Sequence, residues 1–333
     1  MTMATAALIN PEIRLVALAE ADPAGIESLF DEQCDEWAAL LRWDYSGPSK
    51  LIREVTRRRE LSGFAVMTGG RAIGFCFYII EVDRCSIGDI YVSKAWRGIG
   101  CDYQMAAAIL QRLEHLPRLR RVESQCVTVG NDAANAFFLA QRFEKFDRHY
   151  MMIDLAGRDE SDLPAVPVRR PNGAPLDVSL RPWRDDDFGV AARIIHSSYR
   201  GEHDSRINSQ YRTEEGCAEL LSILTEHIWC GEFLPHVSQV AIDRASGRPV
   251  GVLIASCLGD GAGHIGQISI APAYQGTGIG RRMIGAALAG FDRLGFSAAS
   301  LAVTDANASA FHLYRSCGFR VVHTFPVFYR ERK

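Results

Sequence analysis

Residues 275–280, Gln-Gly-Thr-Gly-Ile-Gly, form the segment best suited to chemistry. They follow the strand-like run ISIAP and precede the helix-like run RRMIGAALAGF. Three glycines in six residues let a backbone turn tightly and approach a ligand closely. The N–H groups of such a turn and the first N–H groups of the following helix can converge on one point, where the helix dipole also favours negative charge. The segment therefore predicts a pyrophosphate-binding loop.

Two residues further along the chain add to this loop. Asn307 and Tyr314 precede Gly318 and Phe319 in the run DANASAFHLYRSCGF, which predicts another helix. The loop alone has neither the glycine spacing of the dinucleotide fingerprint nor the Lys-Ser/Thr pair of a P-loop, and a turn that needs glycine only for its backbone is the alternative. Taken in order, Gln-x-x-Gly-x-Gly, Asn and Tyr resemble the GNAT superfamily of N-acetyltransferases over residues 178–330.

The resemblance implies a coenzyme site. In the family such a loop holds the pyrophosphate of acetyl-coenzyme A (acetyl-CoA), and the pantetheine arm lies along the preceding strand like an additional edge. Ordinary strand packing and, for Asn307, capping of a helix are alternative roles. No metal is expected. The residues expected to bind the coenzyme are Ile268, Ser269, Ile270, Gln275, Gly276, Thr277, Gly278, Ile279, Gly280, Arg281 and Asn307.

Two side chains are expected to act in catalysis. Transfer of an acetyl group from a thioester to an amine needs a neutral amine, a stabilised oxyanion and a protonated leaving thiolate. Tyr314 is the expected proton donor to the thiolate, with core packing as its alternative role. The base is not evident, because Gln267 stands where some relatives carry Glu and an amide cannot take a proton. His264 is the first candidate, because it lies at the start of the strand that precedes the loop. The other candidates are Glu202, Glu232, His236 and a water relay.

The first half of the chain carries an altered copy of these motifs. Residues 97–102, Arg-Gly-Ile-Gly-Cys-Asp, fit the loop pattern until Asp102, whose carboxylate we expect to repel a phosphate. Aligning ANAFFLAQRF with ASAFHLYRSCGF places Ala140 where Tyr314 stands. We therefore expect the first half to keep its fold and to have lost catalysis. The alternative is that Asp102 turns outward and the loop still holds the coenzyme.

Both halves repeat one order of elements: a short strand, a helix, paired strand-like runs, a strand-turn-helix unit, and a closing strand and helix. Residues 156–175 contain four prolines and no apolar periodicity, which is typical of a linker. We expect an α+β fold of two tandem GNAT-type domains, each a curved mixed β-sheet flanked by helices. The first covers residues 1–155 and the second 176–333, a layout that resembles mycothiol synthase within the superfamily.

The amino-acid composition limits the class of protein, its partners and its cellular compartment. Of the 333 residues, 47% are hydrophobic and 23% charged, which is typical of a globular protein. A formal net charge of -3 does not favour nucleic acid as a partner, and no apolar run reaches the ~18 residues of a membrane span. Nine cysteines without a Cys-x-x-Cys pair indicate a reducing compartment and no zinc site. We expect a cytoplasmic protein without a secretory signal.

The expected function is acetyl-CoA-dependent transfer of an acetyl group to the primary amine of a small molecule or peptide, by direct attack in the second half. Two alternatives remain: an acyl-CoA-binding sensor or scaffold without turnover, and an enzyme with two active sites. A homodimer is also left open. Tyr199, Tyr211 and Trp229 lie among acidic residues, which suits a cationic amine, whereas a solvated loop and amphipathic helix is the alternative. The acidic residues are Glu202, Asp204, Glu214 and Glu215.

Overall fold

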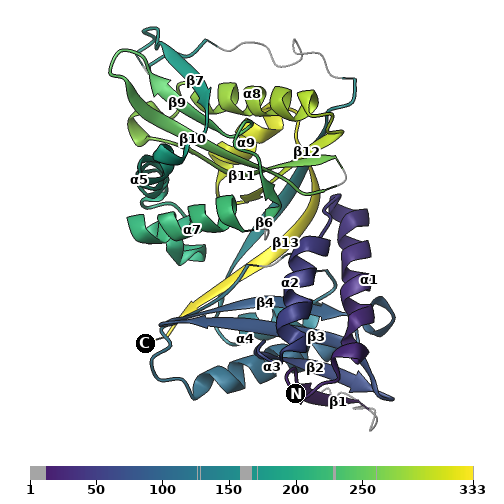
Figure 1. The fold of residues 1–333 in the computed structure, drawn as a ribbon. Helices are drawn as coiled ribbons and strands as arrows, with labels where there is room; N and C mark the ends of the chain where they lie inside the picture. Colours follow the sequence, from purple (N-terminus) through teal and green to yellow (C-terminus); the bar gives the residue numbers. More distant parts are fainter. Residues whose placement is uncertain are drawn as a thin grey trace, which may run out of the picture. The chain divides into compact units, whose positions relative to one another are not determined.

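The computed structural model divides into two compact units (Figure 1). Unit 1 comprises Met1–Ala38, Pro48–Asp147 and Phe325–Lys333, and unit 2 comprises Ala39–Gly47 and Arg148–Thr324. Each unit thus holds most of one half of the chain and a short segment of the other half. Half of the expected linker (residues 158–166 and 171) and Trp229 lie outside the described residues. The residues that the structure describes are 13–125, 127, 129–157, 167–170, 172–227, 230–259 and 261–332.

Unit 1 is a mixed sheet with helices. Its elements are β1 (Arg14–Ala17), α1 (Pro23–Leu41), α2 (Ser46–Arg57), β2 (Gly63–Thr68), β3 (Arg71–Glu81), β4 (Arg84–Val92), α3 (Cys101–Glu114), β5 (Arg121–Ser124), α4 (Asp132–Ala140) and the last residues of β13 (Arg320–Glu331). The strand order is β1-β2-β3-β4-β5-β13, in which β4 and β5 are parallel and the other pairs antiparallel. Met105 and Ile109 of α3 and Phe138 of α4 belong to its buried core.

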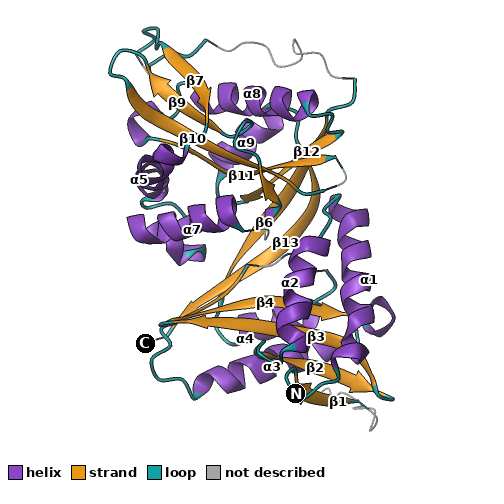
Figure 2. Ribbon diagram, viewed as in Figure 1, coloured by secondary structure: helices purple, strands orange, loops and turns teal. Residues whose placement is uncertain are grey.

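Unit 2 has the same plan (Figure 2). Its elements are the end of β6 (Glu144–Asp154), β7 (Val178–Pro182), α5 (Phe188–Tyr199), α6 (Asp204–Ile207), α7 (Glu214–Glu226), β8 (Glu232–Phe233), β9 (Gln239–Asp243), β10 (Arg248–Cys257), β11 (Ala262–Ile270), α8 (Ile279–Arg293), β12 (Ala298–Thr304), α9 (Ala308–Ser316) and the start of β13. The strand order is β6-β12-β11-β10-β9-β7, and β8 pairs with β10. Only β11 and β12 are parallel among the described pairs.

The parallel pair in unit 2 separates part-way along its length. Strands β11 and β12 pair from Ala262–Ala298 to Ile265–Leu301, and β11 then continues to Ile270 without β12 beside it. The register with β10 shifts at the same level, between Ile254 and Ala255, which indicates a bulge. The second part of β11 therefore has one edge whose backbone groups are not used by β12.

Helices cover both faces of the unit 2 sheet. Met283, Ile284 and Phe291 of α8 are fully buried in one core cluster together with residues of α9. Ile195 of α5 and Leu221 of α7 are buried in a second cluster with residues of β9 and β10. Burial of these apolar faces fixes both helix layers against the sheet. The expected α+β class with mixed sheets is confirmed.

Two features are absent from the part of the chain that the structure describes. None of the helices in that part of the chain is long and apolar enough to cross a membrane. The same residues contain no group of three or more His, Cys, Asp or Glu side chains arranged to hold a metal ion.

Candidate active site

The glycine loop of unit 2 joins β11 to α8. After the short 3₁₀ turn Pro272–Tyr274, Gly276 has a φ of +71° and Gly278, at the N-cap of α8, a φ of +92°. Residues with side chains rarely adopt these angles, so the loop needs glycine at both positions. The first helical hydrogen bond runs from Arg282 N to Gly278 O. The N–H groups at the start of α8 are thus not taken up within the helix and can serve an anion.

A pocket of about 510 Å³ opens along this loop and the edge of β11. Its walls come from α5, β11, the loop, α8 and α9. Thr277 does not line it, because its buried hydroxyl donates to Tyr274 O at 2.6 Å behind the loop. Ten of the eleven expected coenzyme residues and Tyr314 line the pocket: Ile268, Ser269, Ile270, Gln275, Gly276, Gly278, Ile279, Gly280, Arg281 and Asn307.

Arg281 brings an unsatisfied donor to this pocket. Its Nη1 donates to Ser316 Oγ at 2.8 Å, which fixes the side chain between α8 and α9. Its Nε atom is enclosed and has no hydrogen-bond partner. A buried donor without a partner is costly, so a ligand with acceptor oxygens fits this position. The residues present therefore suit the pyrophosphate of a coenzyme.

Tyr314 extends from α9 into the same pocket and is almost fully buried. Burial raises the pKa of this phenol strongly, and the Asp204 carboxylate and the neighbouring Tyr199 phenol raise it further. Among the described residues its hydroxyl has no hydrogen-bond partner. Tyr314 therefore keeps its proton at neutral pH and has it free for a ligand. Its ring also packs against Phe319, with centroids 6.2 Å apart, so the packing role coexists with this arrangement.

Asn307 and Asp204 lie next to each other at the pocket. Asn307 Oδ1 accepts a hydrogen bond from Ala310 N, so this residue caps α9 and also lines the pocket. Asp204, the first residue of α6, accepts from Asn307 Nδ2 at 3.3 Å and from Thr304 Oγ1 at 2.5 Å. The capping role of Asn307 is thus present in the structure, and its contact with the coenzyme stays a prediction. Asp204 reaches the pocket only through Asn307 and does not line it.

Two stacked tyrosines occupy the α5 side of β11. The rings of Tyr199 and Tyr211 lie 3.9 Å apart at 13°. Tyr211 OH donates to Gln267 Oε1 at 3.1 Å, and Gln267 Nε2 donates to Tyr199 OH and to Ser269 Oγ. The amide therefore holds both phenols in place. The sequence pointed to the two tyrosines as part of an amine site but not to their hydrogen bonds with Gln267, because the three residues come from separate segments.

His264 lies in the interior and does not line the pocket. Its ring is stacked between Trp43 and Tyr150, at centroid distances of 6.4 and 6.2 Å, and Nδ1 is 2.9 Å from Ser300 Oγ. Burial lowers its pKa to about 4. The expectation that His264 is the base stays a prediction. Of the other candidates, Glu202 lines the pocket, whereas Glu232 and His236 do not.

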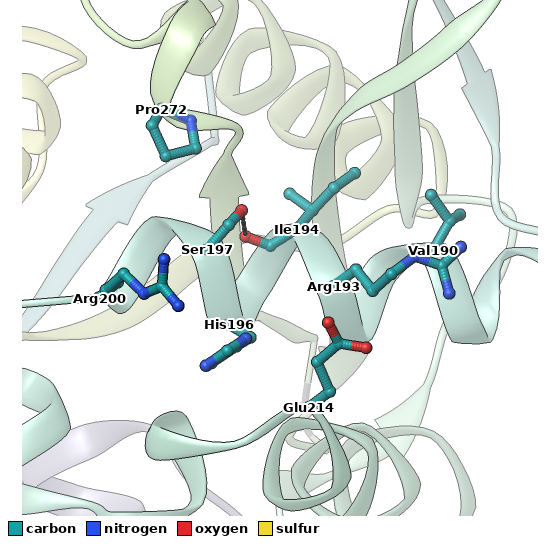
Figure 3. A pocket seen from close by; sticks show the side chains of 8 residues that line it. All are labelled: Val190, Arg193, Ile194, His196, Ser197, Arg200, Glu214 and Pro272. Atoms are coloured by element: carbon teal, nitrogen blue, oxygen red, sulfur yellow. Dashed lines mark hydrogen bonds between the residues drawn. The ribbon is translucent and has the colours of Figure 1, made fainter.

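A second hollow of about 490 Å³ runs along the other side of α5 and shares no lining residue with the first (Figure 3). Arg193 and His196 of α5 and Arg200 directly after it line it, and Glu214 at the start of α7 faces them. Pro272, in the turn before the glycine loop, completes the lining. The basic side chains of α5 thus turn away from the pocket that contains Tyr314.

Comparison with known proteins agrees with this geometry. A sequence profile described as the acetyltransferase (GNAT) family matches residues 26–143 and 205–319. The chain belongs to the GNAT family. The two matches lie one in each half, so the GNAT fold occurs twice in tandem. The resemblance inferred from the glycine loop, Asn307 and Tyr314 is confirmed.

Individual relatives support the tandem layout. Mycothiol acetyltransferase of Propionibacterium freudenreichii subsp. shermanii is 29% identical over 166 residues, which are 48% of this chain and 49% of that protein. The match thus spans about half the length of this relative. Two solved structures share the fold over 96% of this chain. A GCN5-related N-acetyltransferase from Sphaerobacter thermophilus has a TM-score of 0.63 at 18% identity, over 96% of its own chain. A tandem GNAT protein from the clavulanic acid biosynthesis pathway has 0.56 at 15%, over 98%.

The GNAT repeat of unit 1 keeps the loop but places Asp102 differently from our expectation. Gly98 and Gly100 have φ values of +82° and +87°, which match the loop of unit 2. The Asp102 carboxylate is buried and accepts a hydrogen bond from Ala134 N at 2.8 Å, at the start of α4. It therefore stabilises the N-terminus of α4. This contact argues against the expected repulsion of phosphate by Asp102, which stays a prediction.

In unit 1 the first residue of the glycine loop forms an ion pair with helix α1. This residue, Arg97, donates through two guanidinium nitrogens to the Glu36 carboxylate of α1, at 2.8 and 2.5 Å. Tyr91 OH donates to the same carboxylate at 3.2 Å. Glu32, one turn earlier in α1, accepts from Ser93 Oγ and Lys94 N. Helix α1 is thus tied to the end of β4 and to the loop that would hold a coenzyme.

The closing helices also align differently from the sequence alignment. Helices α4 and α9 each have nine residues and follow Asn131 and Asn307, respectively, at their N-caps. Counting from these caps places Phe138, not Ala140, at the position of Tyr314. The motif Ala-x-Ala-Phe misled the alignment by two residues, because it lies at different places in the two helices. The conclusion is unchanged, because Phe138 also lacks a hydroxyl.

Proposed function

We propose that this protein is an acetyl-CoA-dependent N-acetyltransferase and that unit 2 carries the reaction. The observation that supports this most is the single pocket in which the glycine loop, the unpaired edge of β11 and the Tyr314 hydroxyl meet. A loop for phosphate alone would suit many ligands. A loop, a free strand edge and a protonated phenol together suit a thioester carried on a long pantetheine arm.

The coenzyme is bound by main-chain groups in this proposal. The N–H groups of the loop and of the α8 start, with Arg281, hold the pyrophosphate. The pantetheine amides hydrogen-bond along Ile268 to Ile270, where β12 no longer pairs with β11. A Cβ on Gly280 would lie 3.2 Å from Leu313 Cδ2, so even alanine there would require the Leu313 side chain to shift by a few tenths of an ångström. The loop and α9 are therefore closely packed at this position.

The reaction follows from the groups around the pocket. The amine nitrogen attacks the thioester carbonyl carbon, a C–N bond forms, and the C–S bond breaks. The amine proton passes to a base, for which His264 remains our first candidate and Glu202 the competitor that lines the pocket. The leaving thiolate takes its proton from Tyr314, whose raised pKa keeps that proton in place until the thiolate forms.

Unit 1 is proposed to be a degenerate GNAT domain that has kept its fold. Phe138 has no proton to give to a thiolate, and Glu36 holds Arg97 across the loop. A weaker coenzyme site or none is expected there. This argues against an enzyme with two active sites, and the available Tyr314 hydroxyl argues against a sensor without turnover.

The acceptor is proposed to be the primary amine of a small molecule or peptide, in the cytoplasm, without nucleic acid or membrane as a partner. Asp204 and the tyrosine pair beside the pocket suit an amine. A named relative, mycothiol acetyltransferase, favours a small-molecule acceptor.

The test uses the full chain. Acetyl-CoA is titrated by calorimetry, and release of free thiol is then followed with a panel of amines. We expect one binding event and amine-dependent thiol release. Binding without thiol release from any amine would favour the sensor, and two equal binding events that both support turnover would favour two active sites.

A further inference from the structure

Arg148 lies on the same face of the unit 2 sheet as the tyrosine network. It is the first residue of the unit 2 part of β6 and pairs with Thr304 of β12. Side chains alternate along a strand, so Arg148 and Tyr150 project from one face. The Tyr150 ring stacks on His264, and Thr304 donates to Asp204 of α6. Both contacts place Arg148 on the side of the sheet that carries α5, α6 and α7.

The guanidinium of Arg148 has no partner among the described residues. Its Nε atom is enclosed without a hydrogen bond, and no carboxylate of a described residue lies within 4.0 Å of the group. Arg181, another partly buried arginine of unit 2, holds Asp187 through two hydrogen bonds. A half-buried cation without such a partner is costly, because its desolvation is not repaid. An anionic ligand at the Arg148 guanidinium would supply the missing partner.

The positive charge of Arg148 affects the pKa values of two tyrosines that line the pocket and of His264. Burial raises the pKa of Tyr314 and raises that of Tyr199 to about 12, and the positive charge of Arg148 opposes both shifts. The same charge acts with burial to lower the pKa of His264. Arg148 is thus near enough to the two phenols and the imidazole to influence all three.

Asp204 lies beside the Arg148 position. Thr304 is the ladder partner of Arg148 and the hydrogen-bond donor to Asp204, so the two charged residues lie on either side of one threonine. They form no ion pair with each other. Two opposite charges held near each other but unpaired are complementary to a ligand that carries both an ammonium and an anionic group.

We propose that Arg148 binds an anionic group on the acceptor, so that the substrate class of unit 2 is an amine that also carries a carboxylate or a phosphate. This inference rests on the proposed function. Asp204 faces the amine, and the Arg148 guanidinium binds the two oxygens of the anion side by side. The anion then fixes the position of the amine in front of the thioester, which raises the effective concentration of the nucleophile.

The experiment compares matched acceptors that differ only in the anionic group. Thiol release from acetyl-CoA is measured for free amino acids against their amides, and for O-phosphoethanolamine against ethanolamine. We expect about 10- to 100-fold higher kcat/KM for the anionic member of the preferred pair. The pair that shows the preference identifies the anion as carboxylate or phosphate. Arg148→Gln should remove the preference by slowing the anionic acceptor alone, and Arg148→Lys should restore part of it.

Controls separate this from a loss of fold and from failure of the proposed function. Arg248→Gln changes an exposed arginine of unit 2 and should leave the preference and the thermal midpoint unchanged. Equal kcat/KM within every pair, or an equal loss for both members in Arg148→Gln, overturns the inference and leaves the acetyltransferase standing. Thiol release only from amines without an anionic group has the same meaning. Bound acetyl-CoA without thiol release from any amine contradicts the proposed function and the inference with it.

Discussion

Units 1 and 2 share the backbone of the strand, glycine loop and helix, but the side chains around the loop differ. Strands β4 and β11 align without a gap, and their glycine loops begin with Arg97 and Gln275. Arg97 Nε donates to Val92 O and Gln275 Nε2 to Ile270 O, so both side chains tie the loop to the end of the preceding strand. Arginine has further donors, and in unit 1 these hold Glu36 of α1. The strand-loop-helix is thus a stable local structure whether or not a ligand uses it.

The comparison of the two units distinguishes residues that the fold requires from the residue that we propose for catalysis. The positive φ angles of Gly98 and Gly100 persist in unit 1, because the turn cannot form without them. The hydroxyl of Tyr314 has no counterpart there, because Phe138 fills the same core position without it. The glycine loop is therefore common to both units, and the two units differ at the hydroxyl that we propose as the proton donor.

The largest expected effect comes from closing the loop of unit 2. Gly278→Asp should abolish acetyl-CoA binding, because it places charge and bulk at the phosphate position. Gly100→Asp, the matched change in unit 1, should leave binding unchanged. Calorimetry on both variants measures this, with circular dichroism to confirm folding. Unchanged affinity in a folded Gly278→Asp variant would refute the assignment of the cradle.

The next largest effect is expected when Tyr314 of α9 is replaced by phenylalanine, the residue at the matching position of α4. Tyr314→Phe should lower kcat by roughly 10²–10⁴-fold while leaving acetyl-CoA affinity nearly intact, because only the proton donor is lost. Steady-state kinetics and calorimetry together separate the two quantities. An active variant with an unchanged pH profile would assign Tyr314 to packing.

A third prediction concerns the Glu36–Arg97 contact, which we propose keeps the loop of unit 1 from binding the coenzyme. Glu36→Gln frees the guanidinium of Arg97, which can then face a phosphate. In the Gly278→Asp background, where unit 2 is silent, we expect acetyl-CoA binding to become measurable by calorimetry, without turnover. If no heat of binding appears, the Glu36–Arg97 contact is not what keeps the unit 1 loop from the coenzyme.

Strands β11 and β4 differ at His264, which aligns with Ser86. Only the histidine titrates, so we expect it to make the stability of the chain depend on pH. Burial lowers the pKa of folded His264 from 6.5 to about 4, so between these values the unfolded chain binds more protons. Stability should therefore fall as pH falls from 6.5 to 4, and His264→Gln should make this fall shallower. Urea unfolding at several pH values measures it, with exposed His115→Gln as the control. Parallel curves for wild type and His264→Gln would contradict it.

The smallest expected effect is at Asp102. Asp102→Ala removes the acceptor for Ala134 N and should cost about 0.5–2 kcal/mol of stability, as loss of a helix cap does. Acetyl-CoA affinity should not change. Thermal unfolding and calorimetry measure the two outcomes. A gain in coenzyme affinity would show that the carboxylate acts on the loop after all.

The sequence predicted those features whose cause is local. The glycine loop, the α+β class and the tandem layout follow from turns and periodicity within single segments, and the coenzyme residues other than Thr277 do line one pocket. The Tyr199–Tyr211–Gln267 network was not predictable, because three segments meet only in the folded sheet. The place of Arg148 was hidden for the same reason. Its strand precedes the linker, yet it belongs to unit 2.

This exchange of segments has a genetic consequence. Cutting the gene at the linker would leave residues 148–154 on one product and residues 325–331 on the other, each a strand of the unit that its own product does not encode. Neither fragment would carry a complete sheet. The two repeats can therefore diverge in their side chains, but they are inherited, expressed and degraded as one polypeptide.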